Sequence, residues 1–365
     1  MESILSVGTS SSSIGRFVGK VGSCTRRLNQ IAAKELKSRY QEPIFPKASA
    51  EDLKRLTSKD IKDTYKRVAW TNPKDGKLYH LLEESRDKKG VNIRILSSEG
   101  EFIKNATLQP KNIVIFDQFK TLSGIRNLLK FKFTKTPSHG EIVETYLKRA
   151  NPFANVEHLE HKKNIFELLK YRGKLPLDLA TKRFNELDSQ IKSGKKIDYI
   201  SLSETNMGDI GKYSKSSGKY QNYIMQEYGL VEELNPLINA FKSILKKGTR
   251  IFISSGNEGE TAVNKFLAVE GVEGVGAYNR LGRVAKSSSS RNSIFTQHYE
   301  CGKFAGKVVE ENGKKIGINI TGLPGTDLPY NKKNKHLLRF IQGTSYSTPI
   351  RVGKIALNDM MEGII

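Results

Sequence analysis

Gly343-Thr344-Ser345-Tyr346-Ser347-Thr348-Pro349 combines small and hydroxyl-bearing residues with a proline. A stretch with apolar residues at helical spacing follows it, including Ile350, Ile355, Ala356 and Met360. This periodicity predicts a helix that begins at the motif, with the proline in its first turn, where a missing N–H has no cost. The first amides and the dipole of that helix would face the serine.

Ser345 in this motif has two interpretations. It is either part of an N-cap on an ordinary helix or a nucleophile. A serine hydroxyl attacks only when a base takes its proton, and the oxyanion that results needs hydrogen-bond donors, one of which a helix N-terminus supplies. Gly-Thr-Ser alone fits the N-cap, whereas the full seven-residue pattern favours the nucleophile.

A second candidate segment is Ser255-Gly256-Asn257-Glu258-Gly259, directly after the apolar run Ile251-Phe252-Ile253. A strand that ends in this way places the Asn257 amide at its carboxyl end, where it can donate to a developing oxyanion. The alternative is a turn built on the two glycines.

The chain between residues 111 and 278 alternates between two kinds of pattern. Strands are expected at 113–116, 197–202, 250–254 and 272–278, and helices at about 140–150, 163–171, 178–192 and 230–247. This alternation predicts an α/β fold with a doubly wound, mostly parallel sheet and helices on both faces. Catalytic groups in such a sheet belong at the carboxyl ends of the strands.

Two upstream residues complete a recognisable order. Asp117 ends the expected strand 113–116, and the pair His139-Gly140 opens a helical pattern. With the Asn257 and Ser345 segments, this order resembles the subtilisin-like serine proteases, or subtilases. The likeness covers residues 111–361, and it implies the subtilisin-like fold.

The resemblance implies a role for each residue. Ser345 is the expected nucleophile, His139 its general base, and Asp117 the group that orients the imidazole. Asn257 and the backbone at Ser345 would hold the oxyanion. The substrate-binding residues implied are the following: Ser201, Leu202, Ser203, Ser255 and Gly256. The expected activity is hydrolysis of a protein or peptide substrate through an acyl-enzyme, with no cofactor; relatives often bind calcium, but no calcium site is located here.

The sequence departs from the family pattern at three places. Gln118-Phe119 follows Asp117 where the family has Ser/Thr-Gly. Glu141 and Glu144 stand in the expected helix after His139, where small or uncharged residues are usual. Glu204-Thr205 ends the strand expected to line the cleft.

Three regions are expected along the chain. Residues 1–34 form a basic, Ser- and Gly-rich leader or tail, which would direct export or organelle targeting or be a plain tail. Residues 35–108 form a small α+β region, prodomain-like or a docking unit, in which Ser97–Gly100 turns a hairpin. Residues 109–365 form the catalytic domain, and self-cleavage near 100–112 is a possible consequence of this division.

The net charge of +23 suggests nucleic acid or an acidic protein as a partner, although the basic residues are spread along the whole chain and also fit a solvated surface. An inactive, subtilase-like binding protein is therefore the alternative function. No run of about 18 apolar residues predicts a membrane span. No secretory signal is recognisable, and two cysteines fit a reducing compartment.

The chain also contains a pair of closely spaced histidines. His158 and His161 lie three residues apart in Glu157-His158-Leu159-Glu160-His161, whereas zinc proteases of the His-Glu-x-x-His type need a spacing of four. The expected structure is a charged helix surface. The sequence does not predict an oligomeric state.

Overall fold

The computed structural model describes most of the chain after residue 66. The described residues are 67–119, 138–160, 177–203, 207–208, 235–257, 259, 263–279, 282–289, 295–305, 307–311, 313–319, 327–329 and 340–365. The expected leader 1–34, the rest of the region up to residue 66, the expected helix 163–171 and the residues Glu204, Thr205 and His161 lie outside them.

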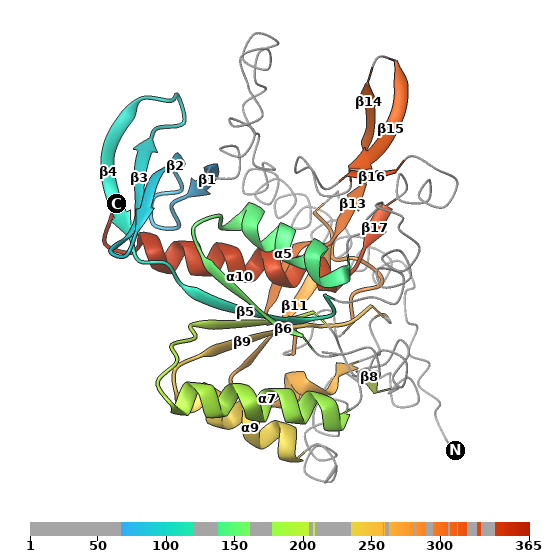
Figure 1. The fold of residues 1–365 in the computed structure, drawn as a ribbon. Helices are drawn as coiled ribbons and strands as arrows, with labels where there is room; N and C mark the ends of the chain where they lie inside the picture. Colours follow the sequence, from blue (N-terminus) through green and yellow to red (C-terminus); the bar gives the residue numbers. More distant parts are fainter. Residues whose placement is uncertain are drawn as a thin grey trace, which may run out of the picture.

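A six-stranded, fully parallel sheet forms the centre of the molecule (Figure 1). The strands, in spatial order, are β12 (His298–Cys301), β11 (Val272–Tyr278), β9 (Arg250–Ser254), β7 (Tyr199–Leu202), β5 (Asn112–Asp117) and β6 (Asn155–Glu160). The four expected strands are therefore confirmed. Short apolar runs form these inner strands because both faces of a parallel sheet are covered.

Helices cover both faces of this sheet, as expected (Figure 1). α7 (Leu177–Lys192) and α9 (Asn235–Lys246) pack on one face, where their apolar residues share a core with β5, β7 and β9. α5 (His139–Ala150) and α10 (Thr344–Met361) pack on the other. The close approach of α10 to α5 depends on Gly353, because a Cβ there would lie 2.8 Å from the Cβ of Ala150.

The expected charged helix at Glu157–His161 is wrong for the described residues, which form strand β6. Among the described residues, β6 lies at the edge of the sheet and pairs with β5 alone, and its pattern is mostly polar. Leu159 packs against the core on one face, while His158 and Glu160 alternate toward the other. β12, at the opposite edge, was not expected at all.

A four-stranded antiparallel sheet precedes the parallel one. Its strands, in order, are β1 (Arg67–Thr71), β2 (Leu78–Asp87), β3 (Gly90–Leu96) and β4 (Phe102–Leu108). The expected hairpin at Ser97–Gly100 is confirmed as the β3–β4 turn, with the amide of Ser97 donating to the carbonyl of Glu101 at 2.8 Å.

This antiparallel sheet lies against the C-terminal end of α10 (Figure 1). Leu81, Ile93 and Ile95 share a core with Leu357 and other residues of that helix. The indole Nε1 of Trp70 also donates to Oδ1 of Asn358 at 2.7 Å. The described part of the expected region 35–108 is thus packed onto the expected catalytic domain, and the boundary at residue 108 stays a prediction.

Smaller elements complete the described fold. They are β8 (Met207–Gly208), β10 (Val263–Asn264), the 3₁₀ helix η4 (Lys265–Ala268), β13 (Lys303–Ala305), β14 (Lys307–Glu311), β15 (Lys314–Asn319), β16 (Asp327–Pro329) and β17 (Phe340–Gln342). β17 pairs with β13 and leads directly into Gly343 and α10.

Candidate active site

Ser345 is the second residue of α10, at the N-terminal end of the helix. The residue before the helix, Gly343, has no side chain to cap it, and its amide donates to the carbonyl of Gly302 at 2.8 Å. The first backbone amides of a helix have no partner within the helix. The amide of Ser345 is one of these first amides, and its role as an oxyanion donor stays a prediction.

Pro349 is the sixth residue of α10, not a residue of its first turn as expected. A proline at this position cannot donate to the carbonyl four residues earlier, which is that of Ser345. The hydroxyl of Ser203 takes this place and donates to the Ser345 carbonyl at 3.0 Å. In return, Oγ of Ser345 donates to the Ser203 carbonyl at 3.1 Å. The serine motif is thereby tied to the end of β7.

Asp117 and His139 form a hydrogen-bonded pair. Asp117 is the last residue of β5 and is fully buried, and Nδ1 of His139 lies 2.8 and 3.0 Å from its two carboxyl oxygens. Since a carboxylate offers only acceptors, Nδ1 of His139 is the donor of this bond, and in the neutral imidazole the lone pair that a general base needs lies on Nε2. The carboxylate is itself held by the amide of Gln118, which donates to Oδ1 at 2.6 Å.

The start of α5 fixes the position of His139. Ser138 caps the helix, and Ser138 and Glu141 form a capping box in which each side chain accepts from the other residue's amide. One of the departures from the family pattern, Glu141, therefore has a local structural role. The amide of Gly140 also donates to the Gln118 carbonyl at 3.0 Å, which joins α5 to the end of β5.

Tyr346 connects the serine to the histidine. Its ring lies 5.6 Å from the His139 ring and 5.7 Å from that of Tyr146, measured between centroids. Burial, and to a lesser extent the nearby charge of Asp117, raises the pKa of Tyr346 to about 12. The phenol thus stays neutral at physiological pH and adds no charge beside the imidazole. Tyr346, the residue after Ser345, is thus in ring contact with His139.

Asn257 lies beside the N-terminus of α10. The amide of Thr344 donates to Oδ1 of Asn257 at 2.9 Å, and the amide of Gly256 donates to Oγ1 of Thr344 at 3.0 Å. Gly256 has a φ of 103°, a conformation that favours glycine. Because Oδ1 accepts from the amide of Thr344, the orientation of the Asn257 amide group beside the start of α10 is defined.

The structure places the expected substrate-binding residues at the ends of β7 and β9. The side chains of Ser201 and Leu202 are buried inside the fold, because β7 is covered on both faces, so they are not available to a substrate. Ser203, Ser255 and Gly256 are also buried, and the hydroxyl of Ser203 is engaged with Ser345. Any contact from these segments would come from backbone atoms.

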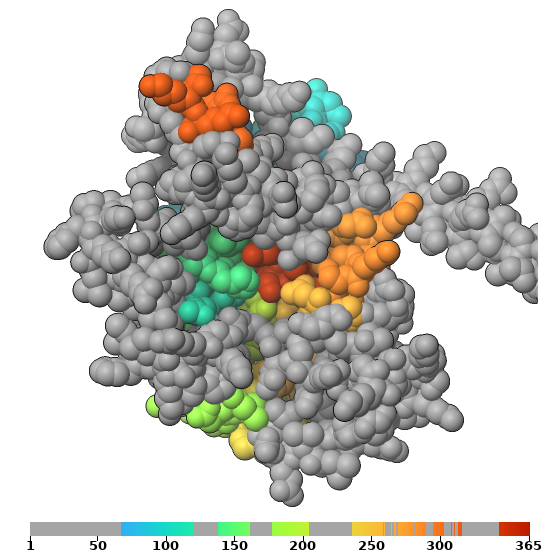
Figure 2. Space-filling model, turned by 90° about the vertical axis from the view of Figure 1, so that its right-hand side faces the viewer, coloured from blue at the N-terminus to red at the C-terminus, as the bar shows by residue number. Residues whose placement is uncertain are grey.

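These segments gather on one face of the molecule. Figure 2 shows teal and green segments (β5 and α5), the red start of α10 and yellow segments next to one another on that face. β5 and the start of α10 are more than 200 residues apart in the sequence. The hydrogen bonds of Ser345 to Ser203 and of Thr344 to Asn257 also join residues that are 142 and 87 positions apart.

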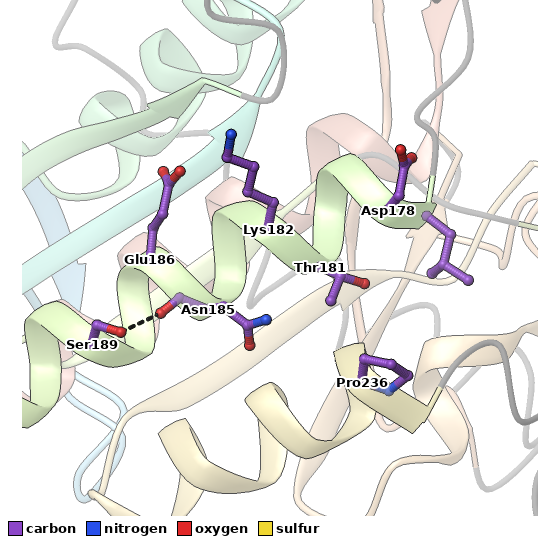
Figure 3. A pocket seen from close by; sticks show the side chains of 8 residues that line it. Asp178, Thr181, Lys182, Asn185, Glu186, Ser189 and Pro236 are labelled. Atoms are coloured by element: carbon purple, nitrogen blue, oxygen red, sulfur yellow. Dashed lines mark hydrogen bonds between the residues drawn. The ribbon is translucent and has the colours of Figure 1, made fainter.

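A surface pocket of about 870 Å³ lies elsewhere, along the outer side of α7 (Figure 3). Its lining includes Asp178, Lys182, Asn185 and Pro236. Since α7 packs on the sheet face opposite to α5 and α10, this pocket is separate from the candidate site.

Two further properties concern metals and membranes. Among the residues that the structure describes, no group of three or more His, Cys, Asp or Glu side chains is arranged to hold a metal ion, so no residue is assigned to calcium. Within the same part of the chain, no helix is long and apolar enough to cross a membrane.

Comparison with solved structures found distant similarities to proteases. A lanthipeptide protease matches 69% of this chain and 74% of its own, at 14% identity and a TM-score of 0.43. The patellamide maturation protease PatA matches 68% of this chain and 77% of its own, at 15% identity and a TM-score of 0.41. The likeness to these proteases is one of fold. The epidermin leader peptide processing serine protease of Staphylococcus aureus matches 68% of this chain and 64% of its own, at 16% identity and a TM-score of 0.41.

Comparison of the sequence with protein-family models and with curated proteins found no match. The structural similarities are distant, and the assignment of the site depends on this chain's own residues.

Proposed function

We propose that this chain is a serine endopeptidase that hydrolyses a protein substrate. The observation that carries the proposal is the buried Asp117 carboxylate bound to Nδ1 of His139, whose ring contacts the residue after Ser345. A buried carboxylate on Nδ1 selects the imidazole tautomer that accepts a proton at Nε2 and stabilises the cation that forms. The residue types, their order and the helix N-terminus at Ser345 all support this chemistry.

The proposed reaction has two halves. Oγ of Ser345 attacks the scissile carbonyl while Nε2 of His139 takes its proton, and the tetrahedral oxyanion is held by the Ser345 amide and the side-chain amide of Asn257. His139 then gives the proton to the leaving amine, which leaves an acyl-enzyme. Water, deprotonated by His139, attacks the ester, and the acid is released as His139 returns the proton to Oγ of Ser345. For the first step, the Ser345 hydroxyl must leave the Ser203 carbonyl and turn to the imidazole.

A fluorophosphonate probe tests the proposal directly, because it labels a serine only when the serine is activated. We expect the wild type to be labelled at Ser345, and Ser345→Ala and His139→Ala to lose labelling. Two matched variants should keep the labelling. Ser347→Ala removes a buried hydroxyl that donates to the Thr344 carbonyl, and His298→Ala removes a histidine at the far edge of the sheet. An unlabelled wild type beside a labelled control subtilase would refute the proposal.

A second candidate function is an inactive, subtilase-like binding protein. The direction of the Ser345 hydroxyl toward the Ser203 carbonyl and the net charge of +23 favour it. It predicts binding to nucleic acid or an acidic protein that weakens steeply with salt and persists in Ser345→Ala. Binding that is unchanged between low and physiological salt would rule out this electrostatic form.

A further inference from the structure

Phe119 fills the space between the end of β5 and the start of α5. It follows Asp117 by two residues, and its ring atoms lie 2.9 to 3.0 Å from the place that a Cβ on residue 140 would occupy. Any side chain at Gly140 would therefore push the ring away. The phenylalanine and the glycine beside His139 fit one another, so the ring limits how far the first turn of α5 can move.

The ring of Phe119 is held in turn by the edge strand β6. The imidazole of His158 stacks on it, with centroids 3.8 Å apart and planes inclined by 14°. The backbone amide of Phe119 donates to a carboxyl oxygen of Glu160 at 2.9 Å. Glu160 is also the register partner of Asp117 in the β5–β6 pair. β6 therefore lies beside β5 up to the position of Asp117.

Glu144, on α5, is the hydrogen-bond partner of His158. Its Oε2 lies 2.9 Å from Nε2 of His158, and its Oε1 lies 2.6 Å from Nζ of Lys148. Burial raises the pKa of Glu144, but the hydrogen bonds and charges of His158 and Lys148 outweigh this and lower it to about 2. The carboxylate is therefore charged at neutral pH and holds the His158 ring against Phe119.

We propose that Phe119, His158 and Glu144 form a clamp whose function is to position the Asp117–His139 pair. The three are positioning residues, since they act through the start of α5 and the end of β5. The inference rests on the proposed protease function. It also links two departures from the subtilase pattern, Phe119 and Glu144, with the histidine on β6: the ring takes the space next to Gly140, and the histidine and the acid hold the ring.

Kinetics of Phe119→Ala and His158→Ala against a peptide substrate test the clamp. We expect kcat to fall by about 10- to 100-fold with little change in KM, because a misplacement of the base by about 1 Å affects the reaction more than binding. Phe119→Tyr keeps the ring and should stay close to the wild type. The acidic limb of the kcat/KM profile should also move in Phe119→Ala, since a looser Asp117–His139 bond changes the titration of the base.

His298 provides a matched control. It lies on β12, the opposite edge strand, and its Nε2 lies 2.7 Å from a carboxyl oxygen of Glu273. His298→Ala thus removes a similar His–Glu pair from the same sheet, and its kcat and pH profile should equal those of the wild type. An equal loss in His298→Ala and His158→Ala would show a general structural effect and overturn the clamp.

A second readout does not depend on activity. The proton on Nδ1 of His139, hydrogen-bonded to Asp117, gives a downfield NMR signal that His139→Ala identifies. We expect it to weaken or exchange faster with water in Phe119→Ala and His158→Ala and to persist in His298→Ala. If the wild type is not labelled at Ser345, the protease proposal fails, and this signal still tests the clamp. If Phe119→Ala does not fold, His158→Ala carries the test, because that side chain is partly exposed. An unchanged signal and unchanged kcat in His158→Ala would overturn the inference.

Discussion

The two ends of α10 differ in what they contact. At the N-terminal end, the hydroxyls of Ser347 and Thr348 both donate to the Thr344 carbonyl at 2.9 Å, and Ser345 exchanges hydrogen bonds with Ser203. At the C-terminal end, Leu357 and its neighbours are buried against β1–β4. One helix thus carries the candidate nucleophile at one end and an apolar anchor at the other. The difference shows that apolar packing at one end of a helix can hold in place a candidate site at the other end.

The largest effect on activity is expected from Asp117, the carboxylate bound to His139 near the N-terminal end of α10. Asp117→Asn keeps the size of the side chain but offers an amide, which stabilises the wrong imidazole tautomer. We expect kcat on a peptide substrate to fall by about 10⁴-fold. Thermal unfolding of the variant provides the control, and a loss of less than about tenfold would contradict the role of Asp117.

Asn257→Asp separates the hydrogen bond of the Asn257 side chain to α10 from its proposed role in catalysis. An aspartate still accepts from the Thr344 amide, but the proposed donor to the oxyanion is lost. We expect kcat to fall by about 10²- to 10³-fold with KM nearly unchanged. A change in KM alone would indicate a role in substrate binding instead.

The opposite end of α10 should respond in stability and not in rate. Leu357 is buried in the core that joins α10 to β1–β4. Leu357→Ala should lower the free energy of unfolding by about 2–5 kcal/mol, as measured by urea denaturation. The kcat of the folded variant should equal that of the wild type at low temperature. A loss of kcat under conditions where the variant is folded would show that the two ends are coupled.

The smallest effect concerns the carbonyl that Pro349 leaves without a helical donor. Ser203→Ala removes the hydroxyl that bonds the Ser345 carbonyl, and leaving this acceptor unpaired should cost about 1–3 kcal/mol of stability. Adding Pro349→Ala supplies a backbone N–H four residues after Ser345. The double variant should therefore be more stable than the sum of the single changes predicts, and strict additivity would contradict this account.

Much of the fold followed from apolar periodicity, because inner strands and packed helices leave a clear pattern. The edge strand β6 did not, since Glu157, His158 and Glu160 face partners other than the core and give a polar pattern. The histidine on β6 was therefore expected on a helix. The alternation around Leu159 was the signal that indicated a strand.

The candidate site was predicted in part. Asp117 and His139 were named from their places at a strand end and a helix start, and the structure brings them together. The hydrogen bonds between Ser203 and Ser345 were not expected, because they depend on where α10 begins relative to Pro349. Phe119 was noted only as an unusual neighbour of Asp117, and only its contacts in three dimensions show what it packs against.

The contact between β1–β4 and α10 also has a consequence for how the chain folds. Trp70 and Asn358 are separated by 288 positions, so the antiparallel sheet cannot cover its apolar side until that late helix has been synthesised. Such distant contacts slow folding and leave partly folded chains exposed to aggregation. The same helix brings Tyr346 against the ring of His139. Assembly of the candidate site and completion of the early sheet thus coincide, and a nascent chain acquires both at once.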